Sequence, residues 1–520
     1  MKNPSIMQVA QLPIPGRKTA VTPNGAGVEK ASRVHFVREH GLKLVLISAL
    51  LLLPCFWHRW LVAGDFGSHL YNAWLEQLIE RGQAPGLWIA PQWNNVLFDF
   101  LLSGLGKLMP LGVAGKIAVS AALLLFFWGA FTFVAVVNQR LPWSISPLLL
   151  AITYGWTFQE GLFNYYLSLG LAFWGLAFFW KRKGWQRLIP LLVSPLILMA
   201  HPIGFAWFVG GALYICAVEI FPGRFHFLLV LACVGILVLA HQFLGHHYRV
   251  VAPAHSVTFY NGLDQLIFTN RYLIPVGALV LFGAVAVGGD LWAHRREAGS
   301  RRAYLVPLQL YLIVEAGVLL LPDAVFWPQF AAPTSLLTER FTLISAVLLC
   351  CLLCAMQPRR WHLVTLAAIS LSYFSFLYLD TAALNRMEEE AWRLVHSARP
   401  GERILATIGS PLKYRFSTKH IVDQACLGYC FSYGNYEAPS TQFRIRAAPG
   451  NRFVMSKIEG AAAMEAGEYI VQPQDLPASQ IYQCGPTWRD LCIHELRAGE
   501  RNDRLGVHPV LGIYPRPQEK

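Results

Sequence analysis

Long apolar runs, separated by short polar segments, dominate the first 380 residues and constrain the fold more than any other feature. The first run, Leu44–Val62, is long enough to cross about 30 Å of hydrocarbon at about 1.5 Å per helical residue. Ten later runs are also candidate spans: 113–137, 142–157, 161–180, 188–201, 203–221, 226–244, 273–293, 303–321, 341–356 and 361–379. We therefore predict an α-helical polytopic membrane protein with about 11 transmembrane helices.

The distribution of charge predicts the orientation in the membrane. Charged residues make up 14% of the chain, against about 25% in soluble proteins, yet the net charge is +13. Residues 1–380 hold 26 Lys and Arg against 15 Asp and Glu, and residues 381–520 are nearly balanced. With a cytoplasmic N-terminus, 19 of those 26 basic residues fall on the cytoplasmic side, as the positive-inside rule requires. The positive charge thus reflects topology, and we expect no nucleic-acid partner.

Three regions follow from this topology. Residues 1–41 are predicted to be a cytoplasmic tail, and residues 42–380 a transmembrane domain whose first external loop is 63–112. Within that loop, 95–110 is predicted to be an amphipathic helix on the membrane surface. Residues 381–520 are predicted to be a soluble α/β domain on the periplasmic, or extracytoplasmic, side of the inner (plasma) membrane. That domain is expected to begin with a helix over Asn385–His396 and a strand over Arg403–Ile408.

Four of the ten cysteines lie in the predicted soluble domain: Cys426, Cys430, Cys484 and Cys492. An even number of cysteines outside the cytoplasm indicates two disulfides, and three pairings are possible. A four-cysteine zinc site is the alternative, although these spacings fit structural zinc sites poorly.

An acidic residue follows the first predicted span directly, in the segment Gly64-Asp65-Phe66-Gly67-Ser68-His69. The pattern then becomes helical from Ser68 to Glu80. Asp65 is either a functional carboxylate or a helix cap at the water boundary.

The chain resembles the GT-C glycosyltransferases in three features. They are a first span with an acidic residue at its outer end, a long first loop with two surface helices, and many further spans. That superfamily includes protein O-mannosyltransferases, the aminoarabinose transferases of lipid A and mycobacterial arabinosyltransferases. The chain departs from the first two groups because Asp65 is followed by Phe66 instead of a second acidic residue. The topological likeness covers about 44–380, and the motif covers only 62–112.

The resemblance implies an enzyme that transfers a sugar from a polyprenyl-phosphate donor to a lipid, glycan or protein acceptor at the outer face of the membrane. It implies that Asp65 is the general base, which must lie within hydrogen-bond reach of the acceptor hydroxyl. His69 is one helical turn further on, where it can orient Asp65 or bind a metal with it. Glu160, in a short outer loop, is a candidate second acid.

The leaving phosphate needs cations or a metal. Candidate phosphate-binding residues are Arg340, Arg271 and Arg249, and simple anchoring at helix ends is the alternative reading. Candidate sugar- or acceptor-binding residues are Asn164, His201, His246 and His247. A divalent metal is compatible with these residues, although no ligand set is evident and no cofactor can be named.

The densest polar and aromatic run of the soluble domain is His420–Arg446, which we expect either to cover the site or to serve disulfide-pinned folding alone. Two other functions stay open. A transporter or flippase of a lipid-linked intermediate would show inverted repeats and broken midplane helices, and no such symmetry is evident. A non-catalytic assembly protein on the same fold would tolerate the loss of Asp65.

Overall fold

The computed structural model describes residues 25–252, 260–293, 298–408, 415–485, 487 and 490–504. Internal contacts divide the chain into one unit that ends at Leu50 and a second that begins at Leu51. Helix α1 (Gly25–Phe56) contributes residues to both. Because α1 begins at Gly25, residues 25–41 of the predicted cytoplasmic tail are helical, and residues 1–24 lie outside the described part of the chain.

Seven of the described helices are long and apolar enough to cross a membrane. These helical segments are Arg38–Phe56 in α1, Leu111–Asn138 (α4), Pro202–Ile220 (α9), Gly223–His247 (η3 and α10), Asn270–Ala293 (η5 and α11), Leu337–Ala355 (α13) and Arg360–Val395 (α14). Their number and composition agree with a polytopic membrane protein.

The other four predicted spans form shorter or more polar elements. Residues 142–157 contain only η1 (Trp143–Ile145) and the short helices α5 (Ser146–Thr153) and α6 (Trp156–Gln159). Residues 188–201 combine η2 (Gly184–Val193) with α8 (Ser194–Ala200), and the described apolar part of α12 (Ala298–Leu320) is Tyr304–Leu320. Helix α7 (Phe163–Lys181) has 19 residues but is not among the seven apolar helices. The count of eleven spans therefore stays a prediction.

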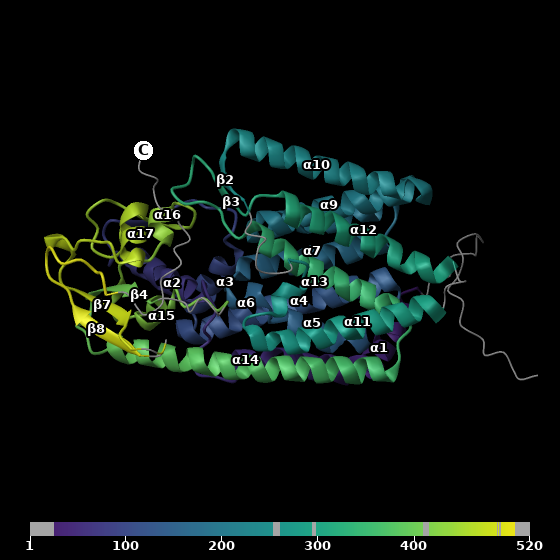
Figure 1. The fold of residues 1–520 in the computed structure, drawn as a ribbon, viewed down its shortest axis with the longest axis horizontal. Coiled ribbons are helices and arrows are strands. Elements are labelled where there is room, and N and C mark those ends of the chain that lie inside the picture. The colour runs from purple at the N-terminus through teal and green to yellow at the C-terminus, as the bar shows by residue number, and fades with distance from the viewer. Residues whose placement is uncertain are drawn as a thin grey trace, which may run out of the picture. The chain divides into compact units, whose positions relative to one another are not determined.

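Helix α7 lies in the centre of the helical region, where it packs against α4 and α9 (Figure 1). Glycines bring α4 and α7 close together. A Cβ on Gly129 would lie 2.6 Å from the carbonyl oxygen of Gly170, and a Cβ on Gly170 would lie 2.8 Å from the amide nitrogen of Phe126. Small residues at such contacts let membrane helices approach closely, and here they hold the N-terminal half of α7 against α4.

The C-terminal region contains the predicted α/β fold. Its four-stranded sheet has the order β5 (Phe431–Ser432), β4 (Arg403–Thr407), β7 (Ala478–Gln483) and β8 (Leu491–Glu495). Strand β4 is parallel to β5 and β7, and β8 is antiparallel to β7. The predicted strand at 403–408 is thus confirmed. Short helices α15 (Ile421–Ala425), α16 (Glu437–Ser440) and α17 (Ile458–Ala466) accompany the sheet.

The cysteines of this region form two local pairs. Cys426 bonds Cys430, with a sulfur–sulfur distance of 2.07 Å, and Cys484 bonds Cys492. One of the three possible pairings is therefore realised, and it leaves no four-cysteine zinc site. The first pair is fully buried in the core between the sheet and α14.

The predicted boundary at residue 380 falls inside α14. The last predicted span and the predicted helix at 385–396 form one continuous helix, which runs from the helical region to the sheet (Figure 1). Met387 and Val395 of α14 are buried in the same core as Ile404 and Ile481 of the sheet. The helix continues because no proline or glycine interrupts residues 360–395.

The loop after α1, which is predicted to be external, is also part of this core. It folds into α2 (Phe66–Glu80), β1 (Leu87–Ile89) and α3 (Leu97–Gly106), which confirms a helix to Glu80 and a short helix within 95–110. Tyr71 and Leu75 of α2 are buried with the residues of the sheet. Strand β1 pairs antiparallel with β6 (Ile445–Ala447) of the C-terminal region. The loop and the C-terminal region therefore fold as one body.

Candidate functional site

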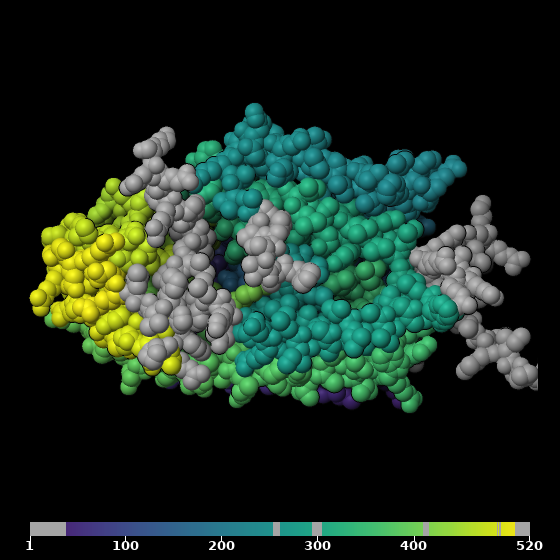
Figure 2. Space-filling view, in the orientation of Figure 1, coloured from purple at the N-terminus to yellow at the C-terminus, as the bar shows by residue number. Residues whose placement is uncertain are grey.

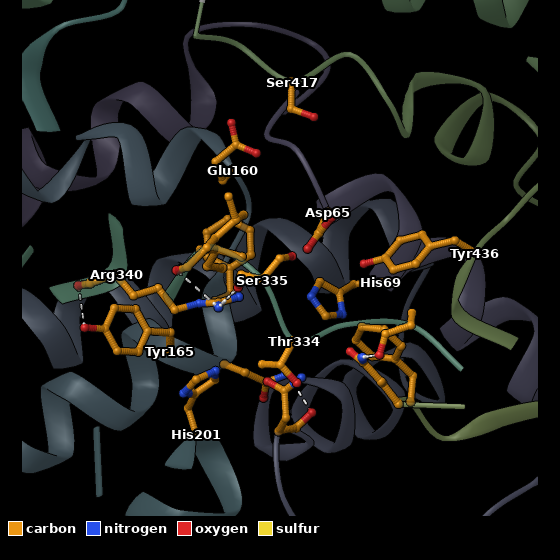
Figure 3. Close-up of a pocket in the computed structure, with 18 of the residues that line it drawn as sticks. Asp65, His69, Glu160, Tyr165, His201, Thr334, Ser335, Arg340, Ser417 and Tyr436 are labelled. Atoms are coloured by element: carbon orange, nitrogen blue, oxygen red, sulfur yellow. Dashed lines mark hydrogen bonds between the residues drawn. The ribbon is translucent and has the colours of Figure 1, made fainter. Parts of the chain in front are cut away.

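A polar cavity lies where the first loop, the ends of several helices and the C-terminal region meet. It has about 980 Å³ of empty space, counting the part open to solvent. In Figure 2 the surface is hollowed between the C-terminal region and the helices, and purple and blue atoms are visible at the bottom of the hollow. Its walls carry the predicted residues Asp65, His69, Glu160, Asn164, His201 and Arg340. Figure 3 shows Asp65 and His69 beside Tyr436, with Glu160, Tyr165, His201 and Arg340 around them.

Two glycines bring Asp65 next to Glu160. The amide nitrogen of Asp65 donates to the carbonyl oxygen of Glu160 at 3.0 Å. A Cβ on Gly64 would lie 2.3 Å from that same oxygen, and a Cβ on Gly161 would lie 2.7 Å from the amide nitrogen of Asp65. Both glycines have positive φ, at 23° and 74°, which side-chain-bearing residues rarely adopt. The close contact and the backbone conformation thus both require glycine.

Asp65 also contacts a histidine from the C-terminal region. Its Oδ1 lies 3.4 Å from Nε2 of His420, and Nδ1 of His420 lies 2.6 Å from Oδ2 of Asp423. His420 is 3% exposed, whereas the Asp65 side chain is 31% exposed at the cavity wall. The imidazole therefore lies between two carboxylates. It is hydrogen-bonded to the buried Asp423, and its Nε2 faces Asp65 at ion-pair distance with no hydrogen-bond partner among the described residues. Ser432 and Asn435 donate hydrogen bonds to Asp423.

His69 belongs to a second histidine–carboxylate pair. Its Nδ1 lies 2.7 Å from Oδ1 of Asp99 on α3. Asn164 of α7 donates to the other oxygen of Asp99 at 3.2 Å and accepts from the amide of Phe98 at 2.7 Å. Asn164 thus uses its side-chain amide to hold the start of α3, in addition to lining the cavity. The side chain of His69 lies beside Asp65 in Figure 3.

The charges of these groups depend on one another. Burial acts to raise the pKa of Asp65, but the nearby imidazole of His420 and its positive charge outweigh burial and hold this pKa below its usual value. Burial raises the pKa of Glu160 to about 8, and the charge of Asp65 adds to this shift. Burial favours the neutral form of His69 and His420, but Asp99 and Asp423 respectively overcome it and raise each pKa to about 9. At neutral pH the site therefore holds an ionised Asp65 beside a protonated Glu160.

Arg340 supplies positive charge from the first turn of α13. One guanidinium nitrogen bonds the carbonyl oxygens of Ser335 and Leu336, and the buried Nε has no hydrogen-bond partner among the described residues. Tyr165 donates to the carbonyl oxygen of Arg340 at 2.6 Å and so ties α13 to α7. His201 accepts from the amide of Ile203 through Nδ1.

The other predicted phosphate- and acceptor-binding residues lie outside this cavity. Arg271 lies in η5, directly before α11. It is ion-paired with Asp380 and donates a hydrogen bond to the carbonyl oxygen of Phe376. Arg249, in β2 (Arg249–Val251), lies over the ring of Phe326 at 4.6 Å. His246 and His247 end α10, and Nδ1 of His247 bonds the carbonyl oxygen of Phe243. The structure does not bring these four residues to Asp65.

Sequence reasoning missed the individual roles of several residues at or behind this site: Asp99, Ser417, Lys419, His420, Asp423 and Tyr436. The run His420–Arg446 is predicted to be a possible cover of the site, and three of its residues line the cavity: Tyr436, Gln442 and Phe443. The sequence signal for His420 and Asp423 is a histidine three residues before an aspartate at a helix start. The contact between His420 and Asp65 could not be predicted, because the two residues are far apart in the sequence.

No group of three or more His, Cys, Asp or Glu side chains is arranged to hold a metal ion in the part of the chain that the structure describes. The residues around Asp65 instead form histidine–carboxylate pairs. Comparisons with protein-family models, curated proteins and solved structures return no match for this chain.

Proposed function

We propose that this protein is a membrane glycosyltransferase that moves a sugar from a polyprenyl-phosphate donor to a lipid, glycan or protein hydroxyl. The observation that carries the proposal is that Asp65, Glu160 and Arg340, from three separate segments, line one cavity. A base, a neutral acid and a fixed cation in one cavity are the groups that sugar transfer from a phosphate requires.

Each group has a defined part in the reaction. The acceptor oxygen forms a bond to the anomeric carbon as the bond from that carbon to the donor phosphate oxygen breaks. The acceptor proton passes to the carboxylate of Asp65, which is ionised at neutral pH. Arg340 stabilises the negative charge on the departing phosphate by a charge-assisted hydrogen bond. Glu160, protonated at neutral pH, donates a hydrogen bond to a sugar hydroxyl without adding a second negative charge.

The position of the cavity suits a lipid-linked donor. Asp65 follows α1, Glu160 precedes α7, and Arg340 lies in the first turn of α13. Both α1 and α13 contain segments apolar enough to span a membrane, so the cavity lies near the ends of these segments, where a lipid phosphate is found. The C-terminal region, which contains two disulfides, forms one wall of the cavity, and this favours the extracytoplasmic side as the location of the reaction.

The test compares purified wild type with Asp65→Asn in an assay with a pool of radiolabelled polyprenyl-phosphate sugars and membrane-extracted acceptors. We expect transfer by the wild type and a loss of about 10²-fold or more in the variant. Glu80→Gln, at the exposed far end of the same helix, is the matched control and keeps full activity. No transfer by the wild type from any donor would overturn the enzymatic function, and equal activity of Asp65→Asn would overturn its role as base.

A further inference from the structure

His420 and Asp423 form a buried histidine–carboxylate pair behind Asp65, and neither residue has a part in the proposed reaction. Their element, α15, begins directly after His420 and packs on α2. Asp65 occupies the N-cap position of α2, and its side chain makes no capping hydrogen bond there. A Cβ on Gly67 of α2 would lie 2.2 Å from the carbonyl oxygen of His420. The backbone at His420 therefore fits against α2 at a position where only glycine leaves room, and this contact fixes the distance between the imidazole and Asp65.

A buried network holds the imidazole from behind. Asp423 accepts hydrogen bonds from Ser432 and from Asn435, the latter at 2.8 Å. Asn435 also donates to the hydroxyl of Ser68 on α2 at 3.0 Å, and Ser68 donates to Glu437 at 2.8 Å. These side chains are all less than 5% exposed. Since the network returns to α2 three residues after Asp65, it fixes both partners of the contact between Asp65 and His420.

We propose that His420, oriented by Asp423, is a positioning residue that holds the carboxylate of Asp65 ionised and directed into the cavity, so that the C-terminal region completes the active site. The role of His420 in catalysis rests on the proposed function. The pairing itself is a property of the folded protein and can be measured without any sugar transfer.

The charges around the pair determine the expected effect. Asp65 faces His420 and Lys419 from the C-terminal region, His69 from α2, Glu160 from the α6–α7 turn and Arg340 from α13. His420 faces Asp65 and Asp423, and Asp423 in turn faces Glu388 of α14. Replacing His420 by a neutral residue removes this positive charge, while Asp65 stays partly shielded from solvent in the cavity wall. The carboxyl group of Asp65 then keeps its proton to a higher pH.

The test measures the protonation of Asp65 in the full-length detergent-purified protein. A carbodiimide with an amine nucleophile labels protonated carboxyl groups, and mass spectrometry gives the extent of labelling at Asp65 as a function of pH. The variants are His420→Gln and the milder Asp423→Asn, which keeps the imidazole. His494→Gln is the matched control, because His494 also pairs with a carboxylate, Glu500, at 2.8 Å in the same region.

We expect the labelling midpoint of Asp65 to move up by about one pH unit or more in His420→Gln, by less in Asp423→Asn and not at all in the control. The acidic limb of the pH profile for transfer moves in the same direction, whereas a purely structural role lowers activity equally at every pH. An unchanged midpoint in both variants, or an equal shift in the control, would overturn the proposal. If the midpoint shifts but the wild type transfers no sugar, the pairing stands and the proposed function fails.

Discussion

The amide nitrogen of Asp65 donates a hydrogen bond to the carbonyl oxygen of Glu160 at 3.0 Å, which joins the first loop directly to the turn before α7. The backbone positions that carry the two carboxyl groups are therefore held together by a main-chain bond and not by a flexible side-chain contact. Gly64 and Gly161, one on each side of this bond, leave no space for a Cβ. The geometry of the cavity consequently depends on two residues that carry no functional group.

Gly161→Ala is expected to destabilise the protein by about 1–3 kcal/mol and to reduce transfer activity, because the new Cβ meets the amide of Asp65 and φ is positive. Chemical denaturation in detergent measures the first effect. Gly82→Ala is the control, since Gly82 also has positive φ but no atom within 4 Å of the added Cβ. Equal destabilisation by the two substitutions would show that the steric contact has no effect of its own.

Local patterns in the sequence predicted much of this fold. The helix to Glu80, the strand at 403–408 and the α/β character of the C-terminal region follow from residue periodicity, and seven apolar helices follow from composition. The predicted boundary at residue 380 falls inside α14, because a fall in hydropathy does not end a helix. The N-terminal part of α14 supplies the apolar segment, and its C-terminal part supplies Met387, which is buried in the core of the sheet.

The candidate site was predictable only in part, because contacts between residues far apart in the sequence leave no local pattern. Asp65, His69 and Glu160 lie at the ends of apolar runs, where a single charged residue is conspicuous. Arg271 has the same signature, yet it is ion-paired with Asp380, which sequence position does not reveal. His420 reaches Asp65 across more than 350 residues, through packing that has no local pattern.

Glu160 predicts how stability depends on pH. Its pKa is raised to about 8 in the folded protein from an ordinary value of 4.5, by burial first and then by Asp65. The folded state therefore binds more protons than the unfolded state between these values, so this group makes stability fall as pH rises from about 4.5 to 8. Arg415, His420 and Lys419 face Glu160 and oppose the shift.

Glu160→Gln removes this proton linkage, and we expect a flatter dependence of the unfolding midpoint on pH between 5 and 8 than in wild type. Thermal unfolding at several pH values makes the comparison, with exposed Glu80→Gln as the control. Parallel curves for wild type and Glu160→Gln would mean that Glu160 is ionised throughout this range in the folded protein.

Arg444 and Glu76 fix the first loop to the C-terminal region. The guanidinium makes two hydrogen bonds to the carboxylate, at 2.7 and 3.0 Å, with side chains only 12% and 10% exposed. Arg444→Ala is expected to cost about 3–5 kcal/mol, because it leaves a largely buried carboxylate with the hydroxyl of Ser103 but without its cationic partner. The double variant with Glu76→Gln should lose less than the sum of the single losses, as measured by a denaturation cycle. Arg59→Ala, which breaks a mostly exposed pair with Glu389, is expected to have a much smaller effect.

The two disulfides test the proposed orientation of the C-terminal region. Cys484 is exposed, whereas Cys426 and Cys430 are fully buried. In right-side-out membrane vesicles, a mild membrane-impermeant reductant should therefore open Cys484–Cys492 first. An impermeant maleimide should then label Cys484 and Cys492 well before Cys426 and Cys430, as followed by mass spectrometry.

Trp185→Cys supplies the opposite control, because residue 185 is 72% exposed in wild type and lies in a segment predicted to be cytoplasmic. The maleimide should reach this cysteine only after the vesicles are permeabilised. Labelling of residue 185 in sealed vesicles, with Cys484 and Cys492 protected, would place the C-terminal region in the cytoplasm. The cavity with Asp65 and Glu160 would then face the cytoplasm too, because the C-terminal region and the first loop share one core. A donor phosphate exposed at the outer surface would be out of reach, so this one measurement tests the orientation on which the proposed reaction depends.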